Sequence, residues 1–273
     1  MRFHLSLAAL LLSSCTALQN PADARFGLQL YTVRAAMEAD PVATIRQAAA
    51  LGYREVEFAG TYGADPASLC SETRALGLTV AADHADWQVL KTDPAAAFDQ
   101  AEALCADTLV LAWLPPEERS SLAQWREWMV RINAYALMAE QRDMKFAYHA
   151  HDFEFEQVEG IRPIDLLLGG GYIHPSVGFE LDTYWLARAG VDPLDFLKTH
   201  AGRVTHLHLK DMAEDGSMTD VGQGTLPMRA IVAQARKQGV RHFLVERDDA
   251  PDPWASLATS LDSLRAMPLQ QGD

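Results

Sequence analysis

The sequence is poor in cysteine. Its 273 residues include three, Cys15, Cys70 and Cys105. Their spacing matches neither a C-x-x-C motif nor a zinc ribbon, so the sequence predicts no disulfide framework and no cysteine metal site. Cys70 and Cys105 fall in expected helices, where we expect them to pack as small hydrophobic side chains.

Positive charge is also scarce. Lysine and arginine total 23 against 37 aspartates and glutamates, which gives a formal net charge of −14. A surface that binds phosphates needs the opposite sign, so a nucleic-acid partner is disfavoured. Hydrophobic residues make up 49% of the chain and charged residues 22%. That composition is enough for a sizeable core and argues against disorder.

The N-terminal apolar stretch, LSLAALLL at 5–12, is too short to span a membrane. It follows the weakly basic start MRFH and ends in LSSC at 12–15, before a polar spacer that contains proline. This arrangement resembles a bacterial lipoprotein signal with lipidation at Cys15. A plain secretory signal or a chance apolar leader are the alternatives. Acyl chains on Cys15 would anchor the protein to a membrane surface. We therefore expect residues 1–24 to be a signal peptide and spacer, and the protein to lie in the periplasm or cell envelope.

From Phe26 onward, short apolar runs alternate with helical patterns. The expected strands are 26–32, 54–59, 78–84, 107–113, 145–151, 176–182, 203–210 and 240–247. The expected helices are 41–51, 66–76, 94–105, 119–142, 163–169, 192–201, 226–238 and 253–266. Asp-Pro pairs open five of them, at 40–41, 65–66, 93–94, 192–193 and 252–253.

Eight strand–helix units in alternation predict a parallel sheet with helical crossovers. Their number predicts an α/β fold of one domain, a (β/α)8 TIM barrel over 25–268. An open doubly wound sheet is the alternative. It usually has a glycine-rich phosphate loop after its first strand, where this chain has Tyr31-Thr32-Val33-Arg34.

In such a barrel the active site lies at the C-terminal ends of the strands. Alternation along strands five to eight points His149, Asp182, His208 and Glu246 into that mouth. Two imidazoles and two carboxylates make a credible divalent metal site. Each residue alone has a plainer interpretation, such as a hydrogen-bonded histidine or a helix cap. Polar residues of the first three strands reach the same level and could contact substrate or stabilise the barrel mouth: Gln29, Tyr31, Glu57 and His84.

Several stretches together resemble the sugar phosphate isomerase/epimerase family, with its xylose isomerase-like barrel. They are GLQLYTVR at 27–34, LGYREVEFAG at 51–60, YHAHDFEF at 148–155, ELDTYW at 180–185, RVTHLHLKD at 203–211, DVGQG at 220–224 and LVERD at 244–248. The resemblance covers 26–266 and implies a divalent metal, commonly manganese, with cobalt, zinc, iron and magnesium open. Carried over by position, the ligands are His149, Asp182, His208 and Glu246. The last three match the family motif, whereas many epimerases have a glutamate where this chain has His149.

This departure bears on the reaction. Two carboxylates and two neutral imidazoles leave a divalent cation formally neutral, which makes it a stronger Lewis acid than three carboxylates would. It also removes one of the two glutamates that act on opposite faces of the substrate in those epimerases. Glu246, His151 and Lys210 are then the candidates for proton transfer, with Glu57 and His84 as further ones.

The resemblance implies a metal-dependent isomerase or epimerase that removes a proton next to the carbonyl of a small sugar or keto-sugar. The alternatives are a lyase or dehydratase of 3-keto-glycosides or keto-cyclitols, and a non-catalytic surface lipoprotein that binds sugar. Trp185 could stack on a sugar ring, and so could Trp113, although strand parity places Trp113 in the core. We expect Glu154 in a solvated loop. The oligomeric state stays open.

Overall fold

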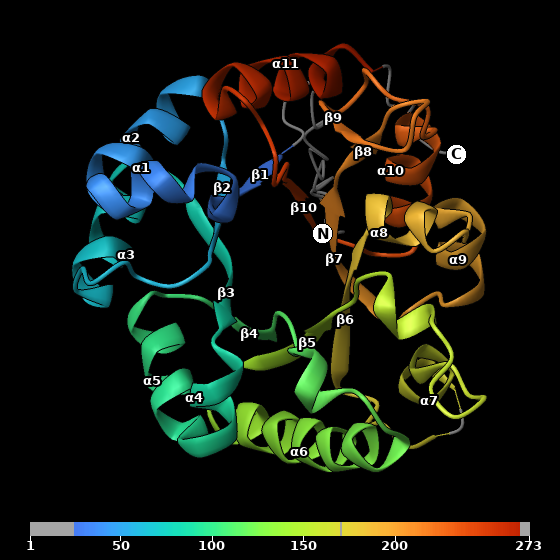
Figure 1. Cartoon of the computed structure of the whole chain (residues 1–273). Coiled ribbons are helices and arrows are strands. Elements are labelled where there is room, and N and C mark those ends of the chain that lie inside the picture. Colours follow the sequence, from blue (N-terminus) through green and yellow to red (C-terminus); the bar gives the residue numbers. More distant parts are fainter. Residues whose placement is uncertain (1–24, 170, 268–273) are drawn as a thin grey trace, which may run out of the picture.

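The computed structural model describes residues 25–169 and 171–267, and it confirms the TIM barrel. Eight parallel strands close into a barrel in the order β1-β10-β7-β6-β5-β4-β3-β2, and the helices form a ring around them (Figure 1). The strands are β1 (Gly27–Gln29), β2 (Glu55–Phe58), β3 (Thr79–Ala85), β4 (Thr108–Leu111), β5 (Lys145–His149), β6 (Val177–Asp182), β7 (Val204–Leu209) and β10 (His242–Val245). The expected signal segment with Cys15, and position 268 at the end of the expected barrel, lie outside the described residues.

The eight predicted helices are all present. They are α2 (Pro41–Leu51), α3 (Pro66–Ala75), α5 (Pro94–Ala103), α6 (Leu122–Gln141), α7 (Pro163–Leu168), α9 (Pro193–Thr199), α10 (Met228–Lys237) and α11 (Pro253–Ala266). The Asp-Pro pairs explain five of the starts. In each, the aspartate side chain accepts a hydrogen bond from a backbone N–H of the first turn, and proline stands at the first helical position.

Short elements that the sequence did not predict follow the strands and surround the barrel mouth. They are the 3₁₀ helix η2 (Leu30–Val33), α1 (Arg34–Ala39), α4 (Trp87–Thr92), η3 (Pro116–Glu118), η4 (Phe153–Phe155), α8 (Thr183–Arg188) and the small antiparallel pair of β8 (Asp211–Met212) and β9 (Met218–Thr219). The first of them, η2, replaces the end of the expected strand 26–32, so that β1 ends at Gln29. The sequence predicts neither helix nor strand for the other segments.

The apolar faces of the strands meet the helix layer, as alternation predicts. Phe58, Phe146, Phe179 and Leu207 are fully or almost fully buried there. Inside the barrel, small side chains of Ala82, Val110 and Ala147 form a separate apolar cluster. The barrel interior is therefore apolar beside β3, β4 and β5. The remaining strands place polar side chains at the C-terminal mouth.

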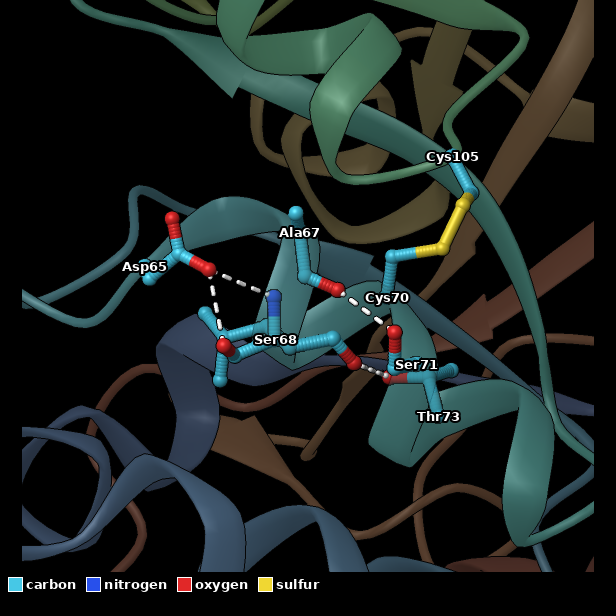
Figure 2. The surroundings of a disulfide bond; sticks show 8 residues. Asp65, Ala67, Ser68, Cys70, Ser71, Thr73 and Cys105 are labelled. Carbon is cyan, nitrogen blue, oxygen red and sulfur yellow. Dashed lines mark hydrogen bonds between the residues drawn. A yellow bond between two sulfur atoms is a disulfide. The ribbon is translucent and has the colours of Figure 1, made fainter.

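The two cysteines of the described chain form a disulfide, so the prediction that they pack as free thiols is wrong. Cys70 of α3 and Cys105, just after α5, have Cα atoms 5.6 Å apart (Figure 2). The two residues are 35 positions apart in the sequence. Their pairing depends on α3 and α5 packing side by side, which no local motif could reveal.

None of the helices within 25–169 and 171–267 is both long and apolar enough to cross a membrane.

Candidate active site

Four side chains from adjacent strands meet at the barrel mouth: His149 of β5, Asp182 of β6, His208 of β7 and Glu246 just after β10. All four are buried. Strand register places Asp182 beside His208 across β6 and β7, while His149 pairs with Glu180 and His208 with Leu244, two residues before Glu246. Ligand atoms of His149, Asp182 and His208 lie within 4.8 Å of one another, a spacing that can hold a metal ion.

Each of these four residues has one buried polar atom without a hydrogen-bond partner in the described part of the chain. The atoms are His149 Nδ1, Asp182 Oδ2, His208 Nδ1 and Glu246 Oε2. Each lies at ion-pair distance from a charged neighbour but without a hydrogen bond, and buried polar atoms are almost always hydrogen-bonded, so four such atoms of ligand type at one place need an explanation. A divalent cation would satisfy all four, and the residues therefore fit the metal that the family resemblance implies.

Asp182 shows how the local sequence prepares this site. Its Oδ1 accepts hydrogen bonds from the backbone N–H groups of Tyr184 (2.9 Å) and Trp185 (3.1 Å) at the start of α8. The cap interpretation of Asp182 is thus correct for one oxygen. Because the cap fixes the carboxylate, the other oxygen is held pointing toward His208.

His208 is held from both sides by carboxylates. Its Nε2 lies 2.7 Å from Glu57 Oε2, and its Nδ1 lies 2.8 Å from Glu246 Oε2. Burial alone would lower the pKa of His208, but Glu180, Glu246 and Glu57 outweigh it and raise that pKa well above its usual value. The same negative field that favours a proton here would favour a divalent cation.

Gln29 and Glu57 are not among the residues that line the cavity of this site, which favours the expectation that they stabilise the barrel mouth over a substrate contact. Both are completely buried. Gln29 Nε2 donates to Glu57 Oε2 at 2.7 Å, and the same oxygen faces His208. Strand alternation correctly predicted that both side chains point into the barrel, but it could not predict how far below the barrel mouth they lie. They hold His208 in place from below.

Glu180 of β6 is the main residue that sequence reasoning did not select. Its Oε2 lies 2.7 Å from His84 Nε2, 3.1 Å from His149 Nδ1 and 3.3 Å from His208 Nε2. Glu57, His84, Glu180 and His208 form a second group with metal-ligand spacing. The sequence could have indicated Glu180, because strand alternation points its side chain to the same inner face as that of Asp182, two residues later.

Lys210 is held in an ion-pair network rather than free for proton transfer. Its Nζ lies 3.1 Å from Asp182 Oδ2, 2.8 Å from Glu246 Oε2 and 3.0 Å from Asp248 Oδ2. Burial would lower the pKa of Lys210, but these three carboxylates outweigh it and raise the pKa above its ordinary value. Lys210 is therefore a fixed positive charge beside the candidate metal ligands, which makes it a poor general base.

His151 differs from Lys210 because its environment favours the neutral form of the side chain. It is largely buried against His149 and Trp185, with ring centroids 4.6 and 5.5 Å away. Burial, with the nearby His149 and Lys210, lowers the pKa of His151 well below its usual value. Its Nδ1 has no hydrogen-bond partner in residues 25–169 and 171–267. A neutral imidazole with an unused nitrogen can accept a proton.

A cavity of about 890 Å³ opens above these groups. Of the residues expected to contact substrate, Tyr31, His84 and Trp185 line it, together with His149, His151, Lys210 and Glu246. Trp113 also lines the cavity and is 43% exposed, so the expectation that it packs in the core is wrong. Strand β4 ends at Leu111, and parity therefore does not apply to Trp113.

Two acidic residues shape the loops around the mouth. Glu154, expected to be solvated, is fully buried, where it accepts hydrogen bonds from Tyr148 Oη (2.6 Å) and the backbone N–H of His151 (2.8 Å). Asp211 is also fully buried and accepts backbone hydrogen bonds from Met212 and from three residues of the 222–226 loop. These bonds hold the loops that carry His151 and follow Lys210.

Known proteins share this architecture. A family model described as the xylose isomerase-like TIM barrel matches residues 45–267. Two structures of sugar phosphate isomerase/epimerase proteins from Parabacteroides distasonis ATCC 8503 superpose with TM-scores of 0.76 and 0.77, at 21% and 23% identity. They cover 95% and 90% of this chain, and 98% and 99% of their own. At these identities the likeness shows the fold.

Two further matches carry dehydratase names. An inosose dehydratase of Clostridium tetani (strain Massachusetts / E88) is 24% identical over 166 residues, which are 54% of this chain. The match spans about half of that relative, 51%. A structure from Bacillus anthracis described as a probable 3-DHS dehydratase has a TM-score of 0.69 at 15% identity, and covers 88% of this chain and 98% of its own.

The family has sugar-processing enzymes among its members, and the family model spans most of the barrel described above, including every residue of the candidate site except Gln29 and Tyr31. The chain belongs to the xylose isomerase-like TIM barrel family.

Proposed function

We propose that the protein is a divalent metal-dependent isomerase or epimerase that removes a proton next to the carbonyl of a sugar or keto-sugar. The single observation behind this proposal is the convergence of four buried atoms of ligand type, on His149, Asp182, His208 and Glu246, none of which makes a hydrogen bond in the described residues. Their contacts with one another and with Lys210 and Glu180 are ion-pair contacts, which a divalent cation could replace.

These four residues would hold the metal, with manganese the first candidate. When bound, it would polarise the substrate carbonyl as a Lewis acid and lower the barrier to removing the adjacent proton. Glu57 keeps the His208 ring oriented from the opposite side. Lys210 supplies a permanent positive charge at the same mouth.

His151 is the proposed proton acceptor. It lines the cavity, its pKa is lowered well below the usual value, and its Nδ1 is unpaired in the described chain. Glu246 is the second candidate. However, its Oε2 already faces Lys210 Nζ and His208 Nδ1 at 2.8 Å and is one of the proposed metal-ligand atoms, so it is less available to a substrate proton than His151 Nδ1.

A dehydratase or lyase is the second candidate function. The residue that favours it is His149, which stands where many epimerases have one of two opposed glutamates. A site with one principal base suits elimination from a keto-sugar, where a single face is deprotonated. The dehydratase names of two matched proteins are consistent with this candidate.

The deciding experiment is solvent deuterium exchange with the manganese-loaded protein and a panel of free sugars and 3-keto-sugars. Exchange with no loss of water or aglycone supports isomerisation or epimerisation, whereas such a loss supports the lyase. His151→Gln should abolish exchange while leaving metal binding intact. If no sugar in the panel exchanges, proton abstraction is wrong. If the purified protein binds no metal and His208→Ala still binds sugar, the non-catalytic alternative holds.

We also propose that the protein works outside the cytoplasm. The Cys70–Cys105 disulfide supports this, because such bonds persist mainly in oxidising compartments. The lipoprotein-like segment that ends in Cys15 agrees with it. Fractionation of cells that express the full chain and its Cys15→Ala variant tests the anchor, since the variant should leave the membrane fraction.

A further inference from the structure

We propose that the cavity contains a second sugar subsite, beside β3, which binds an uncharged ring linked to the reacting sugar. This inference rests on the proposed function and specifies its substrate as a neutral disaccharide or larger glycoside. Its basis is Asp83, a buried carboxylate that none of the steps proposed above uses.

Asp83 has an oxygen without a well-formed hydrogen bond at the cavity. The residue is completely buried, yet it lines the cavity. Its Oδ2 accepts a hydrogen bond from Gln100 Nε2 of α5 at 2.9 Å, and the backbone of Gly60 also contacts the carboxylate. Its Oδ1 is buried and makes no hydrogen bond of good geometry within the described ranges. A substrate hydroxyl is a suitable donor for that oxygen, and such a bond would remove the cost of leaving it unpaired.

Asp83 and the candidate metal ligands lie on different sides of the cavity. Asp83 and His84 are neighbours on β3, so alternation sends their side chains to opposite faces of the strand. The cavity reaches both. His84 faces the barrel interior, where it meets Glu180, whereas Asp83 faces α5. One ligand could therefore extend from the metal ligands over the C-terminal end of β3, where Ala85 and Asp86 line the cavity, to Asp83.

The residues that line the cavity on the side of Asp83 suit a sugar ring. Ala96 and Ala97 of α5 are small, which leaves space in front of Asp83. Trp113 and Val89 line the cavity and are 43% and 39% exposed. An exposed indole and a carboxylate in the same cavity offer an apolar face for the ring carbons and an acceptor for the hydroxyls. The total of about 890 Å³ is near the upper end of the usual 300 to roughly 1,000 Å³ range and exceeds what one hexose needs.

The charge of the lining excludes a phosphorylated group. Among the described residues, Lys210 is the one lysine or arginine that lines the cavity, and three carboxylates already pair with it. Asp83, Asp86 and Asp152 also line the cavity. A phosphate would meet these acidic groups without a free cation, so the linked ring should be neutral.

The experiment measures binding by calorimetry to the manganese-loaded protein. The probes are D-glucose and D-galactose, and the disaccharides cellobiose, maltose and lactose. We expect at least one disaccharide to bind ten times or more tightly than its parent monosaccharide. Asp83→Ala and Trp113→Ala should each reduce that preference about tenfold without changing manganese affinity. Asp83→Asn, which retains one acceptor oxygen and the size of the side chain, should lose less. Tyr172→Ala, at an exposed aromatic residue outside the cavity, should behave as the wild type.

Three results would overturn the subsite: equal binding of mono- and disaccharides, no disaccharide binding at all, or a preference that survives both Asp83→Ala and Trp113→Ala. Tighter binding of glucose 6-phosphate than of glucose would overturn the charge argument. Failure of the proposed function looks different, since it appears as absent manganese binding or absent deuterium exchange, whichever sugar is bound.

Discussion

Removal of the Cys70–Cys105 disulfide should destabilise the barrel by about 4 kcal/mol. The bond joins residues 35 positions apart. A closed loop of that length restricts the unfolded chain enough to raise the free energy of unfolding by about 4 kcal/mol at 25 °C, between the values for short and very long loops. For a domain of this size the loss corresponds to a melting temperature lower by roughly 10 °C.

The assay is urea unfolding of the wild type and of the Cys70→Ser/Cys105→Ser variant, followed by circular dichroism. Cys15→Ser is the matched control, because it removes a cysteine without touching the bridge. Wild type treated with reductant should unfold like the double variant. A difference in the free energy of unfolding below about 1 kcal/mol would refute the reasoning, as would free thiols at both positions in the untreated protein.

The remaining predictions concern the barrel mouth. Glu57→Gln should weaken manganese binding by about 10- to 100-fold in a calorimetric titration, because His208 loses the carboxylate that orients it. Unchanged affinity would show that Glu57 plays no part. Lys210→Met should lower the free energy of unfolding of the metal-free protein by about 3–5 kcal/mol, since three carboxylates lose their cation. Added manganese should recover part of that loss, and a variant as stable as wild type without metal contradicts the network. Glu154→Gln should flatten the pH dependence of stability between about pH 4.5 and 7. Burial raises the pKa of Glu154 from 4.5 to about 7, so in that window the folded state holds a proton that the unfolded state has lost. Wild-type stability therefore falls by up to about 3 kcal/mol as pH rises through it, and parallel wild-type and variant profiles would contradict this.

The fold could be predicted because its signals are local and repeated. Asp-Pro pairs mark helix starts, and strand alternation gives the inward and outward faces, so the eight strands and eight long helices appear near their predicted positions. The same alternation brings His149, Asp182 and His208 together. The helices α4 and α8 were missed, whereas α7, which also has six residues, could be predicted and has a proline at its start that α4 and α8 lack.

The features that could not be predicted from the sequence depend on distances between residues in the folded chain. The bridge between Cys70 and Cys105 needs the packing of two helices. The depth of Gln29 and Glu57 depends on the barrel closing over them. Parity gives the direction of a side chain, but not which carboxylate it meets. The ion pairs of Lys210 therefore could not be read from its position after β7.

The two candidate groups of metal ligands share His208, and the protonation of its two ring nitrogens indicates which group would bind the metal. One group faces its Nε2 and consists of Glu57, His84 and Glu180 with His208, while the other faces Nδ1 and joins His208 to His149 and Asp182. The raised pKa favours two protons on the metal-free His208, and a bound metal would displace one of them, which leaves a neutral imidazole with one nitrogen that has a lone pair and one that bears a proton. At Nε2, the Glu57 oxygen at 2.7 Å accepts that proton, and Gln29 already donates to the same oxygen. The lone pair is then on Nδ1, which lies 3.9 Å from Asp182 Oδ2 and 2.8 Å from Glu246 Oε2. Glu57, with Gln29 behind it, therefore orients His208, and the group of His149, Asp182 and His208 is the one that would bind the metal.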